Sequence, residues 1–246
     1  MNKVGIITQA STVENGPILT EFGGRTLLEH HLDRLEATGL PVLVATSTAG
    51  ADDPVTEIAS ARGLDVHRGS EADPLERFHD TAAAAGLDVI VRVSAGSPLV
   101  DGRLIVTAVE EYLAAEDPWL YLSNTQVPSF PRGFEVEVFG MGALAMAHAR
   151  ARKAPVRARV TAYITDAENP WTHARDIVWP EDRSGDSVAV DPAEEGGASL
   201  ERLRVLIEEY DAAALSVGQI IALLDEHPEL AEAVGEDETG SGTPAE

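Results

Sequence analysis

The sequence predicts an α/β protein built on a doubly wound, mostly parallel, Rossmann-like sheet. Short apolar runs rich in Val and Ile alternate with amphipathic helical patterns from residue 4 to residue 123. The first run leads into a long loop and then a helix, as in many α/β proteins that bind nucleotides. Repeats of this kind give parallel strands joined by right-handed crossovers.

Strands are expected in this first part at residues 4–8, 42–46, 65–67, 89–93 and 119–123. The helices between them follow from apolar stripes. Leu28, His31, Leu32 and Leu35 have the three- and four-residue spacing of one helix face. Similar stripes begin near residues 55, 75 and 105, so each of the first four strands is followed by a helix.

After these strands the pattern changes, which predicts a small inserted β/α region at about residues 125–180. The run FEVEVF at 134–139 alternates apolar and acidic residues, which is typical of a half-buried strand. Helices are expected at 141–152 and 156–166, and a strand at 172–179.

The last part of the chain is expected to return to the sheet. The run SVAVD at 187–191 predicts a buried strand, and helices at 200–210 and 217–225 would complete the fold. We therefore expect one domain over residues 1–233. Residues 234–246 have the charge and the Gly, Ser and Pro content of a disordered end and predict a disordered tail.

Composition limits the classes of function. The 246 residues carry a formal net charge of -24, which argues against a general nucleic-acid or anionic-membrane surface. The chain has no Cys, so disulfides, thiolate metal sites and a Cys nucleophile are excluded. No apolar window reaches membrane-spanning length and no signal-like segment opens the sequence, so we expect a cytoplasmic protein.

The loop after the first strand is unusual for a phosphate site. It reads TQASTVENGPILTEFGG and has no basic residue between Lys3 and Arg25. A triphosphate needs cationic side chains and backbone N–H groups around it. At an effective dielectric constant near 20, a carboxylate such as Glu14 at about 5 Å from a phosphate would cost roughly 3 kcal/mol.

Several stretches occur together in an order that resembles a known family. They include KVGIITQA, GGRTLLEHHLDRL, VHRGSEADPLERF, DVIVRVSAGSPLVD, VAVDPAEE and SVGQIIALLDEHPELA. The chain resembles the cytidylyltransferases that act on acylneuraminate and keto-deoxy-octonate, and especially their spore coat polysaccharide biosynthesis protein F branch. The resemblance implies a fold of the nucleotide-diphospho-sugar transferase type. It also implies transfer of a nucleoside monophosphate from CTP or another triphosphate to a sugar, sugar acid or phosphonate, with release of pyrophosphate.

The same resemblance implies a set of site residues, a Mg²⁺ ion and a homodimer formed through the inserted region. The nucleotide would be bound by Gln9, Ala10, Ser11, Gly16, Thr46, Ser47, Arg68, Gly69, Ser70 and Arg92. The acceptor would be bound by Asn124, Arg132, Glu135 and Glu137, and the metal by Asp191. No residue is assigned a catalytic role. A solvated strand face explains Glu135 and Glu137 equally well, and Asp53 and Asp73 are also expected as helix N-caps before Pro54 and Pro74.

Two departures from the family pattern leave two classes of function open. Ser11 and Pro17 stand where the family has an Arg and a Lys, and Gly96 stands where it has a metal-binding Asp. The first class is a divergent enzyme whose triphosphate is held by other groups, such as Arg25, Arg68 and Arg92. The second is a non-catalytic family member that acts as a binding or partner subunit.

Overall fold

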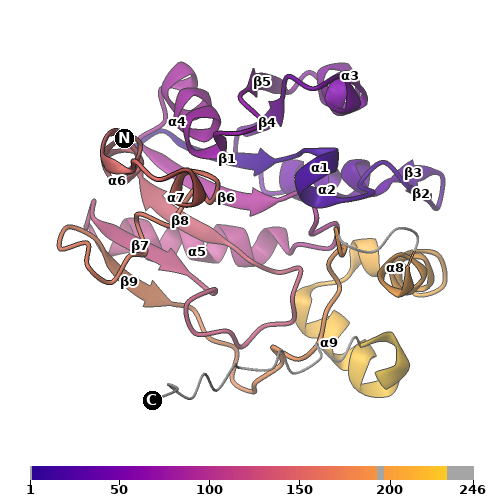
Figure 1. The fold of residues 1–246 in the computed structure, drawn as a ribbon. Coiled ribbons are helices and arrows are strands. Elements are labelled where there is room, and N and C mark those ends of the chain that lie inside the picture. Colours follow the sequence, from indigo (N-terminus) through magenta and orange to yellow (C-terminus); the bar gives the residue numbers. More distant parts are fainter. Residues whose placement is uncertain (1, 193–196, 232–246) are drawn as a thin grey trace, which may run out of the picture.

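The fold is known from a computed structural model, which describes residues 2–192 and 197–231. Its centre is a seven-stranded sheet in the order β5-β4-β1-β6-β8-β7-β9 (Figure 1). The strands are β1 (Val4–Gln9), β4 (Val42–Ser47), β5 (Asp65–Gly69), β6 (Val89–Ser94), β7 (Leu120–Ser123), β8 (Glu137–Gly140) and β9 (His173–Asp176). A separate hairpin pairs β2 (Glu21–Phe22) with β3 (Arg25–Thr26).

Most neighbouring strands in this sheet are parallel, which confirms the predicted fold class. The strands β5, β4, β1 and β6 form a parallel block, and β9 is parallel to β7. The exception is β8, which is antiparallel to both of its neighbours. Because the block is parallel, the carboxyl ends of β1, β4 and β6 meet at one edge of the sheet, where ligands bind in folds of this kind.

Helices cover both faces of the sheet and a third group packs beyond its end (Figure 1). One core lies between the sheet and α2 (Leu27–Glu36), α3 (Asp53–Ala61) and α5 (Gly102–Ala114). The other face is covered by α4 (Pro74–Ala85) and α6 (Met141–Arg150). The helices α8 (Ala198–Glu208) and α9 (Val217–Glu226) form a third core with residues near 130–134 and 188–190.

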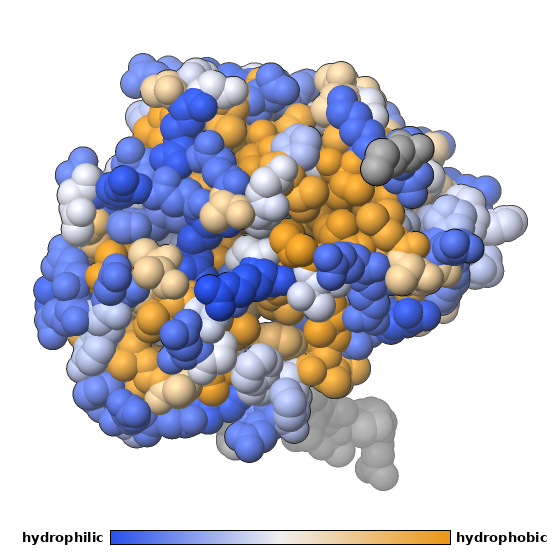
Figure 2. All heavy atoms as spheres, turned by 180° about the vertical axis from the view of Figure 1, so that it is seen from behind, coloured by the Kyte–Doolittle hydropathy of each residue, from blue (hydrophilic) through white to orange (hydrophobic). Residues whose placement is uncertain are grey.

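The remaining helical segments are short. They are α1 (Thr12–Asn15), α7 (Ala154–Arg157), η1 (Gly50–Asp52), η2 (Ala212–Ala214) and η3 (Pro228–Leu230). No helix in the described ranges is long and apolar enough to cross a membrane. Seen from behind, hydrophobic residues come to the surface in the middle of the molecule and hydrophilic residues surround them (Figure 2).

Local signals explain where the helices begin. Thr26 caps α2, and Glu29 completes a capping box by accepting from the Thr26 backbone N–H. Asp73 accepts a hydrogen bond from the Glu76 N–H, which confirms it as the N-cap of α4. The same prediction for Asp53 was wrong. It is the first residue of α3 and its carboxylate pairs with Arg68 instead.

The structure corrects three secondary-structure predictions. The strand expected at 134–139 begins only at Glu137 and is buried throughout, because α5 and α6 cover both of its faces. The helix expected at 156–166 is reduced to α7, after which a series of turns buries Val160 and Ile164. The strand expected at 187–191 forms a single bridge between Ser187 and Arg132, because β8 already occupies the place beside β6.

The predicted tail at 234–246 lies outside the described residues. The single domain over 1–233 and the dimer through the inserted region stay predictions.

Candidate functional site

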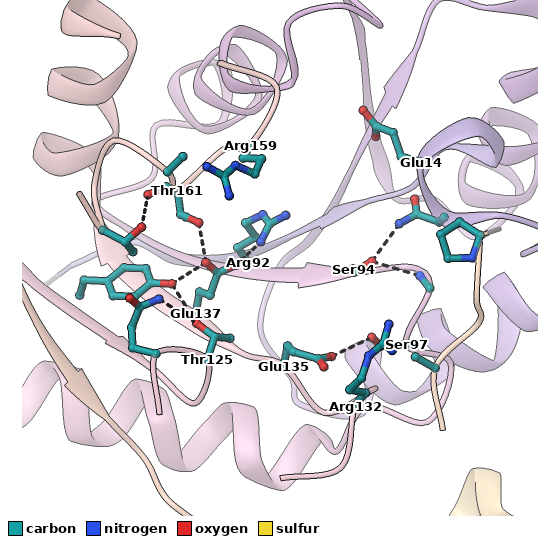
Figure 3. A pocket seen from close by; sticks show the side chains of 18 of the residues that line it. Glu14, Arg92, Ser94, Ser97, Thr125, Arg132, Glu135, Glu137, Arg159 and Thr161 are labelled. Carbon is teal, nitrogen blue, oxygen red and sulfur yellow. Dashed lines mark hydrogen bonds and ion pairs between the residues drawn. The ribbon is translucent and has the colours of Figure 1, made fainter. Parts of the chain in front are cut away.

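The candidate site is a cavity of about 710 Å³ at the carboxyl ends of β1 and β6 (Figure 3). Its walls come from α1, the turn after β6, the ends of β7 and β8, the turns at 159–166 and the segment 189–192. Most of the side chains that line it are polar or charged. They include Glu14, Asn15, Arg92, Ser94, Ser97, Tyr121, Thr125, Arg132, Glu135, Glu137, Arg159, Thr161, Thr165 and Asp166.

Three segments that are distant in sequence meet at one end of the cavity. The Asn15 side chain donates from Nδ2 to Ser94 Oγ at 2.8 Å, and the Val190 N–H donates to the Gly96 carbonyl at 2.8 Å. Gly16 has a φ of +68°, and a Cβ there would lie 2.8 Å from the Pro192 Cα. The loop after β1 therefore packs closely against the segment that carries Asp191, and only glycine suits position 16.

A buried carboxylate forms the opposite wall. Glu137 is ion-paired with Arg92 and accepts hydrogen bonds from the Tyr121 hydroxyl at 2.6 Å and the Thr161 hydroxyl at 2.7 Å. Burial, and next the Glu137 charge, raise the pKa of Tyr121 well above its usual value, so its hydroxyl stays a donor. This arrangement excludes the solvated-face interpretation of Glu137.

Glu135 also lines the cavity, beside Ser97 and Arg132, and is partly buried (Figure 3). Its carboxylate accepts from the Gly133 N–H at 2.9 and 3.1 Å and more weakly from Ser97 Oγ at 3.4 Å. Burial raises the pKa of Glu135, an effect that these hydrogen bonds partly oppose. The solvated-face interpretation therefore fails for Glu135 too.

Two guanidinium groups remain available to a ligand. Arg132 and Arg159 line the cavity from different segments, and neither side chain makes a hydrogen bond or ion pair with any residue in the described ranges (Figure 3). Free guanidinium groups beside a polar cavity favour an anionic ligand, since they bind carboxylates and phosphates in a bidentate manner. Arg159 lies in a stretch where the sequence departs from the family pattern, so the resemblance did not select it.

Several predicted nucleotide-binding residues do not reach this cavity in the present arrangement. Ala10, Ser11, Thr46 and Ser47 are completely buried. Asp52 holds the neighbouring Thr12 and Ser47, accepting from the Thr12 N–H at 2.8 Å, the Thr12 hydroxyl at 2.9 Å and the Ser47 hydroxyl at 2.5 Å. In this arrangement the four buried residues are not accessible to a nucleobase.

Arg68 and its neighbours lie at the edge of the sheet. Arg68 donates to the carbonyls of Ser47 and Ala49 at 2.9 Å each and pairs with Asp53 at 2.7 Å. Gly69 is needed because a Cβ there would lie 2.9 Å from Arg77 Cγ, and the Ser70 carbonyl accepts from the Arg77 guanidinium.

Two further candidates from the sequence have structural partners. Arg25 is half exposed in the β2–β3 hairpin and pairs with Asp33. Asn124 is buried and bridges two segments, donating to the Phe134 carbonyl at 2.9 Å and accepting from the Val136 N–H at 2.9 Å. It lines a smaller cavity of about 370 Å³ that Arg132 and Glu135 also border.

Glu14 faces the cavity, but it is not the bare anion that the sequence suggested. Its carboxylate pairs with Arg77 at 2.7 and 2.9 Å and accepts from Gln9 Nε2 at 2.9 Å. The side chain of Arg77 is only 1% exposed. No local sequence pattern indicates this partner, because α4 brings Arg77 to Glu14 from 63 positions along the chain.

The position expected to bind a metal is only partly equipped for that task. Asp191 lies beside the Gly96 turn, since its neighbour Val190 bonds to Gly96, and its N–H donates to Ser199 Oγ at 3.3 Å. Within residues 2–192 and 197–231, no group of three or more His, Cys, Asp or Glu side chains could hold a metal ion. Gly96 supplies no carboxylate, so these residues alone do not make a complete divalent-metal site.

Two known proteins are similar to this chain in sequence. Uncharacterized protein MJ1063 of Methanocaldococcus jannaschii is 30% identical over 238 residues, which cover 94% of this chain and 93% of that protein. The spore coat polysaccharide biosynthesis protein SpsF of Bacillus subtilis is 28% identical over 133 residues, which cover 50% of this chain and 55% of SpsF.

Solved structures share the fold. A cytidylyltransferase from Leptospira borgpetersenii superposes with a TM-score of 0.87 at 26% identity, over 94% of this chain and 98% of that one. A CMP:2-keto-3-deoxy-manno-octonic acid synthetase complexed with CTP has a TM-score of 0.57 at 16% identity, over 83% of this chain and 98% of that chain. The sequence model of the cytidylyltransferase family matches residues 15–185. The chain therefore belongs to the cytidylyltransferase family.

Proposed function

We propose that this chain transfers a nucleoside monophosphate from CTP, or from another nucleoside triphosphate, to a sugar, sugar acid or phosphonate in polysaccharide or natural-product biosynthesis. The observation that carries the proposal is the cavity at the carboxyl edge of the parallel block, where the loop after β1 meets Gly96 and the segment before Asp191. In the reaction an acceptor oxygen attacks the α-phosphorus. The bond from this phosphorus to the pyrophosphate oxygen breaks, pyrophosphate leaves, and a hydroxyl acceptor gives its proton to solvent.

The lining residues divide between the two substrates in this proposal. Arg92, Arg132 and Arg159 supply positive charge for the phosphates, in place of the missing cations of the loop. Glu135 and Glu137 accept from hydroxyl groups of the acceptor, alongside a wall rich in Ser and Thr hydroxyls. Hydroxyl-bearing acceptors suit such a wall because each hydroxyl can both donate and accept.

In this proposal, binding of Mg²⁺ requires oxygen ligands from the substrate in addition to those of the protein. Asp191 is the carboxylate that would hold the ion, and the phosphates of the nucleotide would provide further oxygen ligands. The ion would neutralise charge between the phosphates. Since the described residues offer no complete metal site, the contacts proposed for the acceptor and the phosphates do not depend on the ion.

Calorimetric titration tests the proposal directly. With Mg²⁺ present, CTP or another nucleoside triphosphate is expected to bind, and pyrophosphate release is expected with an acceptor from a panel of sugars, sugar acids and phosphonates. Asp191→Ala should bind nucleotide more weakly and lose turnover. Absence of binding for every nucleoside triphosphate and for CMP would overturn the proposal, and unchanged turnover in Asp191→Ala would overturn the metal assignment.

A second candidate function, a non-catalytic binding or partner subunit, is favoured by Gly96. A Cβ at this position would meet Ser94 Oγ at 3.5 Å and Asn15 at 3.8 Å, which are ordinary contacts, so glycine is not sterically required here. The site therefore lacks the family's carboxylate at a position where the fold does not demand glycine.

Gly96→Asp separates the two candidates. The new carboxylate beside Asp191 is expected to make the melting temperature rise with Mg²⁺, whereas the uncharged, isosteric Gly96→Asn should show no such rise. If Gly96→Asp also gains nucleotidyl transfer that the unmodified chain lacks, the natural protein is the non-catalytic member. Equal turnover in both proteins would instead favour the enzyme.

A further inference from the structure

A buried arginine lies beneath the loop that follows β1. Arg77 on α4 donates from Nη2 to both Glu14 carboxylate oxygens, at 2.7 and 2.9 Å, and from Nη1 to the Ser70 carbonyl at 2.9 Å. Glu14 is its one carboxylate partner among residues 2–192 and 197–231. A buried cation without a counter-charge is strongly destabilising, so an anion is required at this position.

A second arginine is linked to the same carboxylate through Gln9. Gln9 donates from Nε2 to Glu14 at 2.9 Å, and its Oε1 accepts from Arg92 Nη2 at 3.1 Å. Glu14 is close enough to Arg92 to act on it electrostatically. The Arg92 Nε–H is buried and has no hydrogen-bond partner in the described part of the chain. Arg92 therefore has an N–H group that is not already used in a hydrogen bond.

The Glu14 carboxylate lies on the wall of the cavity, and its side chain is 20% exposed (Figure 3). It projects from α1, a segment of only four residues whose Val13 is 60% exposed. A carboxylate and a phosphate can both accept two parallel hydrogen bonds from a guanidinium group in a bidentate arrangement. Displacing this single side chain would therefore leave a cavity-facing site that is already shaped for an anion.

We propose that Arg77, Arg92 and Gln9 form a binding site for a phosphate or pyrophosphate group, and that the chain fills this site with its own Glu14 carboxylate until the ligand displaces it. The proposal rests on the proposed function in taking the ligand to be a substrate phosphate. Displacement of Glu14 would also break the ion pair between α1 and α4.

Pyrophosphate is the probe that tests this site. Calorimetric titration with pyrophosphate would compare the unmodified protein with Glu14→Ala and with Glu14→Gln, which keeps an oxygen acceptor for Arg77 but removes the charge. Both variants should bind pyrophosphate at least about tenfold more tightly, since a carboxylate that competes for the site has been removed. The matched control is Glu21→Gln, which makes the same charge change on the exposed β2 strand and should leave the affinity unchanged.

The melting temperature provides a second measurement if Glu14→Ala is poorly folded. Pyrophosphate should then raise its melting temperature more than that of Glu21→Gln, because the anion replaces the missing partner of Arg77. Equal pyrophosphate affinity in the folded Glu14→Gln variant and the unmodified protein would overturn the site, even if CTP binds and turns over. Tight pyrophosphate binding by the Glu14 variants, without CTP binding by any protein, would support the site and reject the proposed function.

Discussion

Replacing Glu137 with Gln is expected to lower the free energy of unfolding by about 3 kcal/mol. Glu137 is 5% exposed and is the ion-pair partner of Arg92, whose side chain is 24% exposed. The amide of Gln can still accept from Tyr121 and Thr161, so the loss arises from the uncompensated Arg92 charge. Urea denaturation at neutral pH measures the change.

Two controls separate the loss of the ion pair from the general effect of a substitution on stability. Glu110→Gln makes the same charge change on the exposed face of α5 and should stay within about 0.5 kcal/mol of the unmodified protein. The double variant Arg92→Met with Glu137→Leu should be more stable than Glu137→Gln, because it removes both charges and leaves apolar groups in their place. If Glu137→Gln and Glu110→Gln unfold at the same urea concentration, the ion pair does not stabilise the fold.

Acidification is expected to destabilise the protein through His31. This residue is completely buried on α2, hydrogen-bonded to the Thr8 hydroxyl at 2.8 Å and the Ser97 carbonyl at 2.9 Å. Burial lowers its pKa from 6.5 to about 4, and the nearby Arg34 charge acts in the same direction, while the Ser97 carbonyl opposes both. Below pH 6.5 the unfolded chain therefore binds a proton that the folded chain does not.

The sign and size follow from proton linkage. Stability from a neutral His31 is fully present above the unfolded pKa of 6.5 and is lost as the pH falls towards 4. The difference of about 2.5 units corresponds to roughly 3 kcal/mol.

Urea unfolding curves of the unmodified protein and His31→Gln, measured across this interval, give the contribution of His31 as the difference between their pH slopes. The raised pKa of Glu135, caused mainly by burial, acts in the opposite direction in both proteins and cancels in that difference. Parallel pH profiles would contradict the assignment to His31.

The parallel block could be predicted because its signals are local. The Val- and Ile-rich runs at β1, β4 and β6 are buried on both faces, and such strands show continuous apolar runs in the sequence. The run at 187–191 has the same apolar pattern but does not form a strand. Val188 and Val190 are buried as expected, but their N–H groups bond to Arg132 and Gly96, and burial alone does not distinguish a strand from a crossing segment.

The candidate site could be predicted only in outline. The resemblance led to Arg92, Arg132, Glu135 and Glu137, and the structure brings these four residues to one cavity. It also led to Arg68, whose guanidinium is held by carbonyl groups and Asp53 at the edge of the sheet. Whether an arginine is free or paired depends on neighbours that are distant in sequence, so the motif does not reveal it.

The sequence by itself determined the order of the strands in the parallel block and of the long helices that follow them, the position of the loop after β1 and its lack of Arg and Lys, and the glycine at position 96. Only the tertiary structure decided which carboxylates are paired with an arginine. Glu14, which the sequence presented as an added repulsion, is held by Arg77, and Glu137, which it presented as a possible solvated residue, is buried against Arg92. The physical reason is that ion pairs form between side chains brought together by packing, over separations of 63 and 45 residues, and no local pattern records such pairs.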